Sequence, residues 1–224
     1  MKVLAIISQK GGVSKTTLAT ALAVSGEADW KSVALFDLDP QASACFWSDR
    51  RRASGKSDTP TVRDVNHNRL PFVLEAMRQA GCDLVVLDCP PVHRDVAEQA
   101  IGSADMILIP TRAEALDIRA MTQTVRLVQQ IGKQPHVVLT FCPPVGAEVE
   151  QARAIVGQIG AQLVPVEIHQ RKAFSRAQQE GLAAQEYEPG GKAAEEITRL
   201  YDYSATALYG ASHGKGKAKP RKRA

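Results

Sequence analysis

The chain has 224 residues, of which 44% are apolar and 23% are charged, and its formal net charge is +4. This length supports one well-packed α/β domain and is short for two. No apolar run approaches the roughly 18 residues of a membrane-spanning helix, and the N-terminus shows no secretory leader pattern, so we expect a cytoplasmic protein. The four cysteines show no C-x-x-C spacing, which favours reduced thiols without a metal.

Buried strands and helices alternate along most of the chain. Helical composition begins at Thr16 and returns at residues 41–52, 70–80 and 192–209, whereas the polar segment 54–68 is interpreted as a mobile loop. The alternation predicts a three-layer α/β fold, a mostly parallel twisted sheet with helices on both faces. Short apolar runs predict buried strands at residues 3–7, 32–36, 83–88, 106–109 (stopped by Pro110), 136–140 and 163–168.

A glycine-bearing turn follows the first strand and precedes the first helix. It reads Lys10-Gly11-Gly12-Val13-Ser14-Lys15-Thr16-Thr17. In such a turn, backbone N–H groups and the positive end of a helix dipole converge on an anion, and a lysine adds a mobile charge. Ligands of parallel sheets bind at the carboxyl ends of the strands. We therefore expect this turn, residues 37–41 and residues 88–91 to meet along one edge.

The turn departs from the general phosphate-binding loop G-x-x-x-x-G-K-[ST], because Gln9 and Ser14 occupy its two glycine positions. Its actual form, K-G-G-x-x-K-T-T with a second lysine at Lys10, resembles the deviant Walker A box of the ParA/MinD family of P-loop ATPases. That family usually has glycine where Ser14 stands. If the position needs a positive φ, serine there costs about 1 kcal/mol or more, which affects nucleotide affinity and turnover rather than the fold.

The resemblance implies a Mg²⁺-dependent ATPase with ATP and ADP as its nucleotides. Lys15 would hold the phosphates and Thr16 the metal ion, while Lys10 would reach the nucleotide of a second subunit in an ATP-dependent homodimer. The residues expected to bind the nucleotide are Lys10, Gly11, Gly12, Val13, Ser14, Lys15, Thr16, Thr17, Gln41 and Asp88.

Carboxylates end two of the other expected strands. Asp88 follows an apolar strand, as in a Walker B motif, and would order the metal shell together with Thr16. The segment Asp37-Leu38-Asp39-Pro40-Gln41 resembles the switch I box of the same family, which assigns Asp39 to the attacking water and Asp37 to the outer metal shell. The expected catalytic residues are then Lys10, Lys15 and Asp39, and the expected metal residues are Thr16, Asp37 and Asp88.

Basic residues near the C-terminus indicate a polyanionic partner. The stretch after the last expected strand is similar to a family segment whose backbone holds adenine and which often contacts DNA, so Arg171, Lys172 and Arg176 are candidates for DNA binding. Beyond an ATPase domain at residues 1–210, the segment 211–224 is expected to be a disordered basic tail. Its candidates for DNA contact are Lys215, Lys217, Lys219, Arg221, Lys222 and Arg223.

Together these features favour a short ParA-type partition ATPase without an N-terminal DNA-reading domain. Its ATP-bound dimer would bind DNA non-specifically on the nucleoid, and an adaptor protein on a centromere or another cargo would stimulate hydrolysis. Higher-order assembly stays open. The alternatives are a MinD-like membrane-associated regulator, ParA-like positioning of a protein cargo, and a metabolic or metal-cluster P-loop enzyme. The tail has no apolar residue larger than alanine, which disfavours a bilayer as partner.

Overall fold

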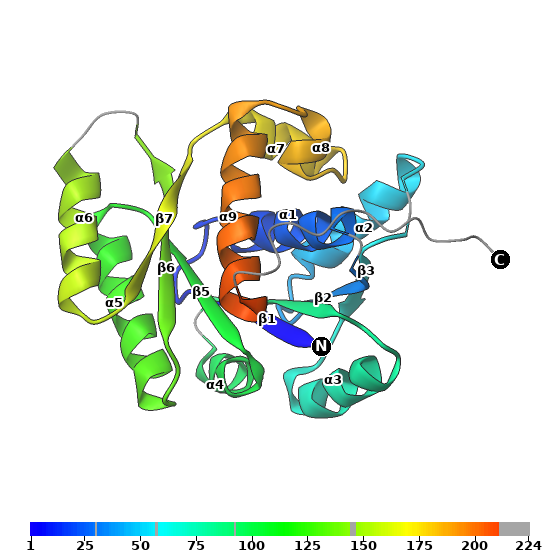
Figure 1. Cartoon of the computed structure of the whole chain (residues 1–224), viewed down its shortest axis with the longest axis horizontal. Helices are drawn as coiled ribbons and strands as arrows, with labels where there is room; N and C mark the ends of the chain where they lie inside the picture. The colour runs from blue at the N-terminus through cyan, green and yellow to red at the C-terminus, as the bar shows by residue number, and fades with distance from the viewer. Residues whose placement is uncertain (30, 57, 92, 144–146, 211–224) are drawn as a thin grey trace.

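The computed structural model describes residues 1–29, 31–56, 58–91, 93–143 and 147–210. Within these ranges it contains one seven-stranded sheet in which every pair of neighbouring strands is parallel (Figure 1). The order across the sheet is β3-β2-β4-β1-β5-β6-β7. The strands are β1 (Lys2–Ile6), β2 (Val33–Asp37), β3 (Thr61–Asp64), β4 (Leu84–Asp88), β5 (Met106–Thr111), β6 (Pro135–Cys142) and β7 (Gln162–His169).

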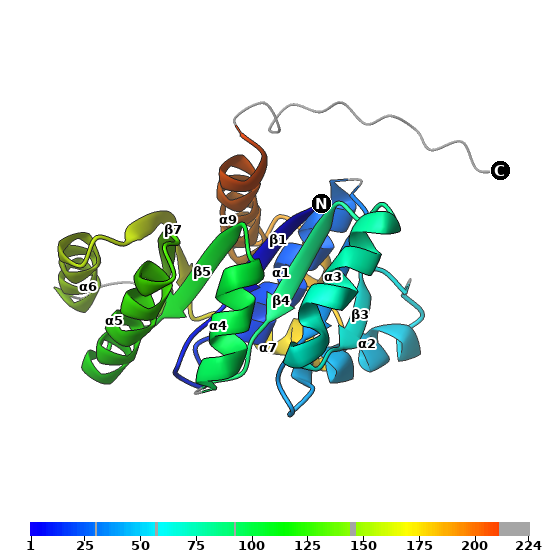
Figure 2. The same cartoon turned by 90° about the horizontal axis from the view of Figure 1, so that it is seen from below.

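Helices cover both faces of this sheet, as the two views show (Figures 1 and 2). One layer consists of α1 (Lys15–Ala28), α2 (Ser43–Ala53), α7 (Lys172–Gln179), α8 (Ala184–Tyr187) and α9 (Lys192–Tyr209). The other consists of the short helix η1 (His67–Arg69) with α3 (Leu70–Gln79), α4 (Arg94–Ser103), α5 (Ala115–Gln130) and α6 (Ala147–Gln158). The predicted three-layer α/β fold is therefore confirmed.

The central strand β1 connects the two apolar cores. Val3 and Ala5 belong to the core under α3, α4 and α5, whereas Leu4 and Ile6 belong to the core under α1 and α9. All four side chains are at most 2% exposed. A strand that is apolar on both faces needs cover on both, because successive side chains point to opposite sides of the sheet.

The predicted mobile loop at residues 54–68 was wrong, because it contains the edge strand β3. Val62 is the one side chain of this strand that is buried, while Thr61, Arg63 and Asp64 are exposed. The strand pairs with β2, with Val62 opposite Leu35. An edge strand of four mainly polar residues lacks the apolar run that marks a buried strand, so its sequence reads as a loop.

The predicted end of the fourth strand at Pro110 was also wrong, because β5 continues to Thr111. The Leu108 carbonyl accepts a hydrogen bond from the N–H of Ile7, which directly follows β1. Pro110 lies two residues further along and directs its backbone to the same side, beyond the point where β1 has ended. Proline has no backbone N–H to donate, but β1 offers no acceptor at this position. The strand therefore tolerates this residue.

The register of the central strands brings the expected site residues together. Asp88 at the end of β4 lies opposite Ile6 of β1 on one side and opposite Asp37 of β2 on the other. The turn that follows β1 therefore leaves the sheet beside both carboxylates. This is the edge at which the sequence placed a ligand.

Candidate nucleotide and phosphate site

The turn between β1 and α1 has the backbone shape of an anion cradle. Gly12 has φ +70°, and Ser14, the N-cap residue that directly precedes α1, has φ 71° and ψ 21°. Ser14 makes no side-chain hydrogen bond to the helix N-terminus, so the first N–H groups of α1 remain free of that cap and face an incoming anion. Position 14 therefore does need a positive φ, and Ser14 adopts a conformation that costs a non-glycine residue about 1 kcal/mol or more.

Lys15 lies beneath this turn and is only 8% exposed. Its ammonium donates a hydrogen bond of 2.9 Å to the backbone carbonyl of Lys10, which closes the turn. Burial lowers the pKa of Lys15, and the nearby carboxylates of Asp88 and Asp39 oppose that shift. A buried ammonium held by a neutral carbonyl has capacity left for a phosphate, because it carries three donors.

Asp88 is the least satisfied charged group of the site. It is 1% exposed, and neither of its carboxylate oxygens has a hydrogen-bond partner among the described residues. Burial raises the pKa of Asp88 to about 7, and the carboxylate of Asp37 adds to the shift. The neighbouring Thr16 hydroxyl and Lys15 lower the pKa, although the hydroxyl does not reach hydrogen-bond geometry with the carboxylate. A buried carboxylate without a partner is costly, and a hydrated Mg²⁺ supplies what it lacks. The donor set fits Mg²⁺ with a nucleotide.

Asp37 has a different environment, although the sequence assigned it to the same metal. It is fully buried, and its Oδ2 accepts hydrogen bonds from the N–H groups of Ala44 (2.8 Å) and Cys45 (3.1 Å) in the first turn of α2. Its Oδ1 accepts from the N–H of Asp39 at 3.1 Å. Asp37 therefore caps α2 from a distance and folds the switch segment. A role in the outer metal shell stays a prediction.

Asp39 is half-buried at the mouth of the site. Its Oδ1 accepts a hydrogen bond of 3.0 Å from the N–H of Gln41, which forms a tight turn after β2. The side chain is therefore held in place by its own loop, while Gln41 is exposed. The water-positioning role of Asp39 stays a prediction.

The Lys10 side chain forms an ion pair outside the turn, with Asp117 on α5. Its ammonium lies 3.4 Å from Oδ1 of Asp117 on α5, which is 3% exposed, whereas the Lys10 side chain is 43% exposed. Asp117 was not among the predicted site residues. A single aspartate in a helix carries no motif, and only the fold brings it beside the turn.

A cavity of about 410 Å³ opens on the other side of Ser14. Its walls include Thr17 and Leu18 of α1, Phe141 of β6, and the connection from β7 to α7. Among the predicted DNA residues, Lys172 and Arg176 are exposed, whereas Arg171 forms an ion pair with the buried Glu196, with Nε 3.0 Å from Oε1. A DNA contact for these three stays a prediction. The predicted contacts from Lys215 onward lie outside the described residues.

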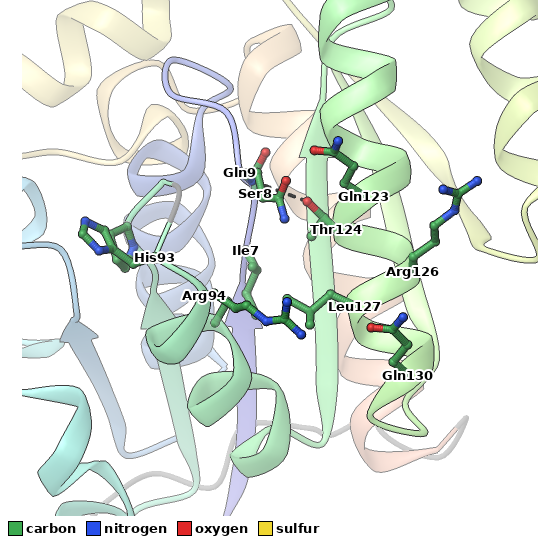
Figure 3. Close-up of a pocket in the computed structure, with 12 residues that line it drawn as sticks. Ile7, Ser8, Gln9, His93, Arg94, Gln123, Thr124, Arg126, Leu127 and Gln130 are labelled. Carbon is green, nitrogen blue, oxygen red and sulfur yellow. Dashed lines mark hydrogen bonds between the residues drawn. The ribbon is translucent and has the colours of Figure 1, made fainter.

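A second cleft, of about 310 Å³, lies between α4 and α5 (Figure 3). Ile7, Ser8 and Gln9 form one wall, and the Gln9 N–H donates to the Thr124 hydroxyl at 3.4 Å. The segment directly after Asp88 contributes Pro90, His93 and Arg94. The cleft thus borders both the start of the phosphate turn and the connection that leaves the Walker B strand.

Comparison with known proteins identifies the family. The model of the CobQ/CobB/MinD/ParA nucleotide binding domain matches residues 4–184. The chain belongs to this family. The maintenance of carboxysome distribution protein A of Gloeobacter kilaueensis is 36% identical over 212 residues, which are 92% of this chain and 94% of that protein. The chromosome partitioning protein ParA of Caulobacter vibrioides is 29% identical over 173 residues, 58% of this chain and 63% of that protein.

A solved structure shows the same fold. The septum site-determining protein MinD of Pyrococcus horikoshii, complexed with Mg-ADP, matches with a TM-score of 0.73 at 18% identity, covering 91% of this chain and 95% of that chain. The resemblance to the ParA/MinD family is thus confirmed, and the chain is a ParA/MinD-type P-loop ATPase. No helix among the described residues is long and apolar enough to cross a membrane.

The unpartnered Asp88 leads to a prediction for the nucleotide-free protein. Its raised pKa means that ionisation destabilises the fold, so the penalty is absent near pH 4, grows as the pH rises and is complete above about pH 7. Asp88→Asn should therefore raise the free energy of unfolding at pH 8 by roughly 2 to 4 kcal/mol. Near pH 4 the two proteins should be nearly equal. Urea titrations at both pH values measure this, and a gain that does not depend on pH would contradict it.

Proposed function

We propose that this protein is a Mg²⁺-dependent positioning ATPase that works as an ATP-bound dimer. The observation that carries the proposal is the placement of the two lysines of the turn. Lys15 is buried under the cradle and closes it, whereas the partly exposed Lys10 pairs with Asp117 on α5, outside the turn. A lysine outside its own phosphate site is available to a second subunit, in the manner of an arginine finger supplied in trans.

The chain's own residues divide the chemistry of such a site among themselves. Backbone N–H groups of the turn and the Lys15 ammonium would bind the phosphates, and Thr16 with Asp88 would hold a Mg²⁺ ion, which would neutralise phosphate charge. Asp39, fixed by its turn with Gln41, orients a water for attack on the terminal phosphate. Lys10 of the partner subunit adds positive charge where negative charge develops in the transition state.

The ATPase cycle would position a cargo when the dimer binds both a cellular surface and an adaptor on that cargo. We assign the surface to DNA, bound without sequence preference by the dimer and by the basic segment at residues 211–224. An adaptor protein would join the dimer to its cargo and stimulate hydrolysis. The similarity to a carboxysome distribution protein over nearly the whole chain favours a protein assembly as cargo. A plasmid or chromosome is the second candidate, favoured by the shorter match to a chromosome partitioning protein.

The two lysines should fail in different ways when replaced. Lys15→Ala should abolish nucleotide binding, because the phosphates lose their buried counter-charge. Lys10→Ala should still bind ADP yet lose ATP-dependent dimerisation and hydrolysis. Calorimetry, sedimentation and phosphate release measure the three properties, with Lys56→Ala as the exposed control.

The partner of Lys10 provides the converse test. Asp117→Asn removes the ion pair that holds the Lys10 side chain within its own subunit. ATP binding should persist, and sedimentation should still detect an ATP-dependent dimer. A Lys10→Ala protein that dimerises and turns over ATP normally would contradict the role in trans.

Asp39→Ala should trap the ATP-bound dimer. The substitution removes the group that orients the water but leaves the turn and its N–H groups in place, so chemistry slows while binding persists. Size-exclusion chromatography with ATP should detect a long-lived dimer that stays on DNA, and Asp58→Ala, which changes an exposed carboxylate before β3, should behave as the unmodified protein. A monomer with weak ATP binding would instead make Asp39 structural.

The C-terminal basic segment should set the salt dependence of DNA binding. Each phosphate contact contributes about −0.9 to the slope of log K against log salt, so deleting residues 215–224 should flatten the slope by up to about five units. Sequence preference should not change, because phosphate contacts carry no sequence information. The measurement is a salt titration of labelled duplex DNA with ATP and with ADP. An unchanged slope would assign all DNA affinity to residues 1–214.

A further inference from the structure

The backbone carbonyls of Gly12 and Val13, which directly precede the strained Ser14, accept hydrogen bonds from side chains at β5 and β6. We propose that Arg112, held in place by Phe141, is a positioning residue for the phosphate-binding turn, and that it keeps the turn in the conformation that Ser14 resists. The inference rests on nucleotide binding by this turn, as set out above. It concerns residues that no motif of the sequence singles out.

Arg112 directly follows β5 and contacts the turn across 100 positions of sequence. Its Nη2 donates a hydrogen bond of 2.6 Å to the backbone carbonyl of Gly12. Its guanidinium lies over the ring of Phe141, 4.4 Å from the ring centroid, and the arginine side chain is 34% exposed. A planar cation between an aromatic face and a carbonyl has few alternative positions, so its contact with the turn is well defined.

The backbone of β6 is shaped to present that ring. The pairing of β6 with β7 shifts register between Thr140 and Cys142, and Phe141 between them has φ +53°. Bulges re-aim a side chain beside functional sites, and a left-handed phenylalanine persists only where its surroundings hold it. Here the contact with Arg112 is part of those surroundings.

The hydrogen bond from Arg112 to the Gly12 carbonyl determines the direction of the Val13 N–H. Because the peptide unit is planar and trans, the Gly12 carbonyl and the Val13 N–H point in opposite directions. Fixing the carbonyl toward Arg112 therefore fixes the Val13 N–H away from it. The Thr140 hydroxyl lies 3.4 Å from the Val13 carbonyl and acts in the same way on the Ser14 N–H.

This bracing matters more here than in a turn with glycine at position 14. Glycine adopts a positive φ without strain, whereas serine favours relaxation of the turn toward other conformations. Contacts that hold the neighbouring carbonyls oppose that relaxation and keep the N–H groups convergent before an anion arrives. The role of Arg112 should therefore depend on the residue at position 14.

A double-mutant cycle between Arg112 and Ser14 tests the proposal. Arg112→Met should weaken binding of ADP with Mg²⁺ by about tenfold, the effect of losing one charged hydrogen bond. In a Ser14→Gly protein the same substitution should cost less than about threefold, because the turn no longer needs the brace. Arg112→Lys should recover part of the loss. Arg119→Met, an exposed arginine on α5, is the matched control and should have no effect.

The outcomes separate this inference from the proposed function. Equal losses with serine and with glycine at position 14, or no loss with either, would overturn the positioning role while leaving nucleotide binding intact. An unmodified protein that binds no ADP would overturn both. Should Arg112→Met not fold, Phe141→Leu removes the aromatic support and should give the same dependence on Ser14. Unfolding midpoints of the nucleotide-free variants distinguish a loss of binding from a loss of stability.

Discussion

The buried charges at the carboxyl ends of β1, β2 and β4 are the constraint on which the rest of the structure depends. Parallel register places Asp37 and Asp88 side by side, and the turn after β1 places Lys15 close to Asp88 and Asp39. The fold satisfies these groups unequally. Asp37 receives three backbone N–H groups, while Asp88 receives no hydrogen bond among the described residues. A cation with a phosphate ligand meets the need of Asp88, so the sheet is built around a site that its own side chains do not complete.

The motif residues were predictable because their spacing carries chemistry. Lys10, Lys15 and Thr16 surround two glycines, and Asp88 ends an apolar strand, so family resemblance and local physics agree on one edge of the sheet. The long helix at residues 192–209 was predicted with its observed bounds because its apolar face repeats at helical spacing. What could not be predicted depends on tertiary contact. Asp117, Arg112 and Phe141 reach the turn only after α5, β5 and β6 are in place, and β3 lacks the apolar run that would mark it.

The strained Ser14 and the paired Lys10 lie in the same turn and have different roles in the proposed cycle. A strained turn that is braced from β5 and β6 keeps its shape without nucleotide, and Lys10 is paired with Asp117 within the same chain. In the proposed cycle, the conformation of the turn is fixed within one chain, whereas the positive charge needed for hydrolysis is completed by Lys10 of a second subunit. Under the proposed function, this division would tie hydrolysis to dimerisation.

The most direct test of this account is the effect of Mg-ADP on the unfolding midpoint, compared between the unmodified protein and Asp88→Asn. If the metal completes the site at Asp88, the unmodified protein should gain more stability from ADP with Mg²⁺ than from ADP with EDTA. In Asp88→Asn that difference should shrink or vanish, because the carboxylate that orders the metal shell is gone. No stabilisation of the unmodified protein, or a metal dependence that is undiminished in Asp88→Asn, would contradict the account.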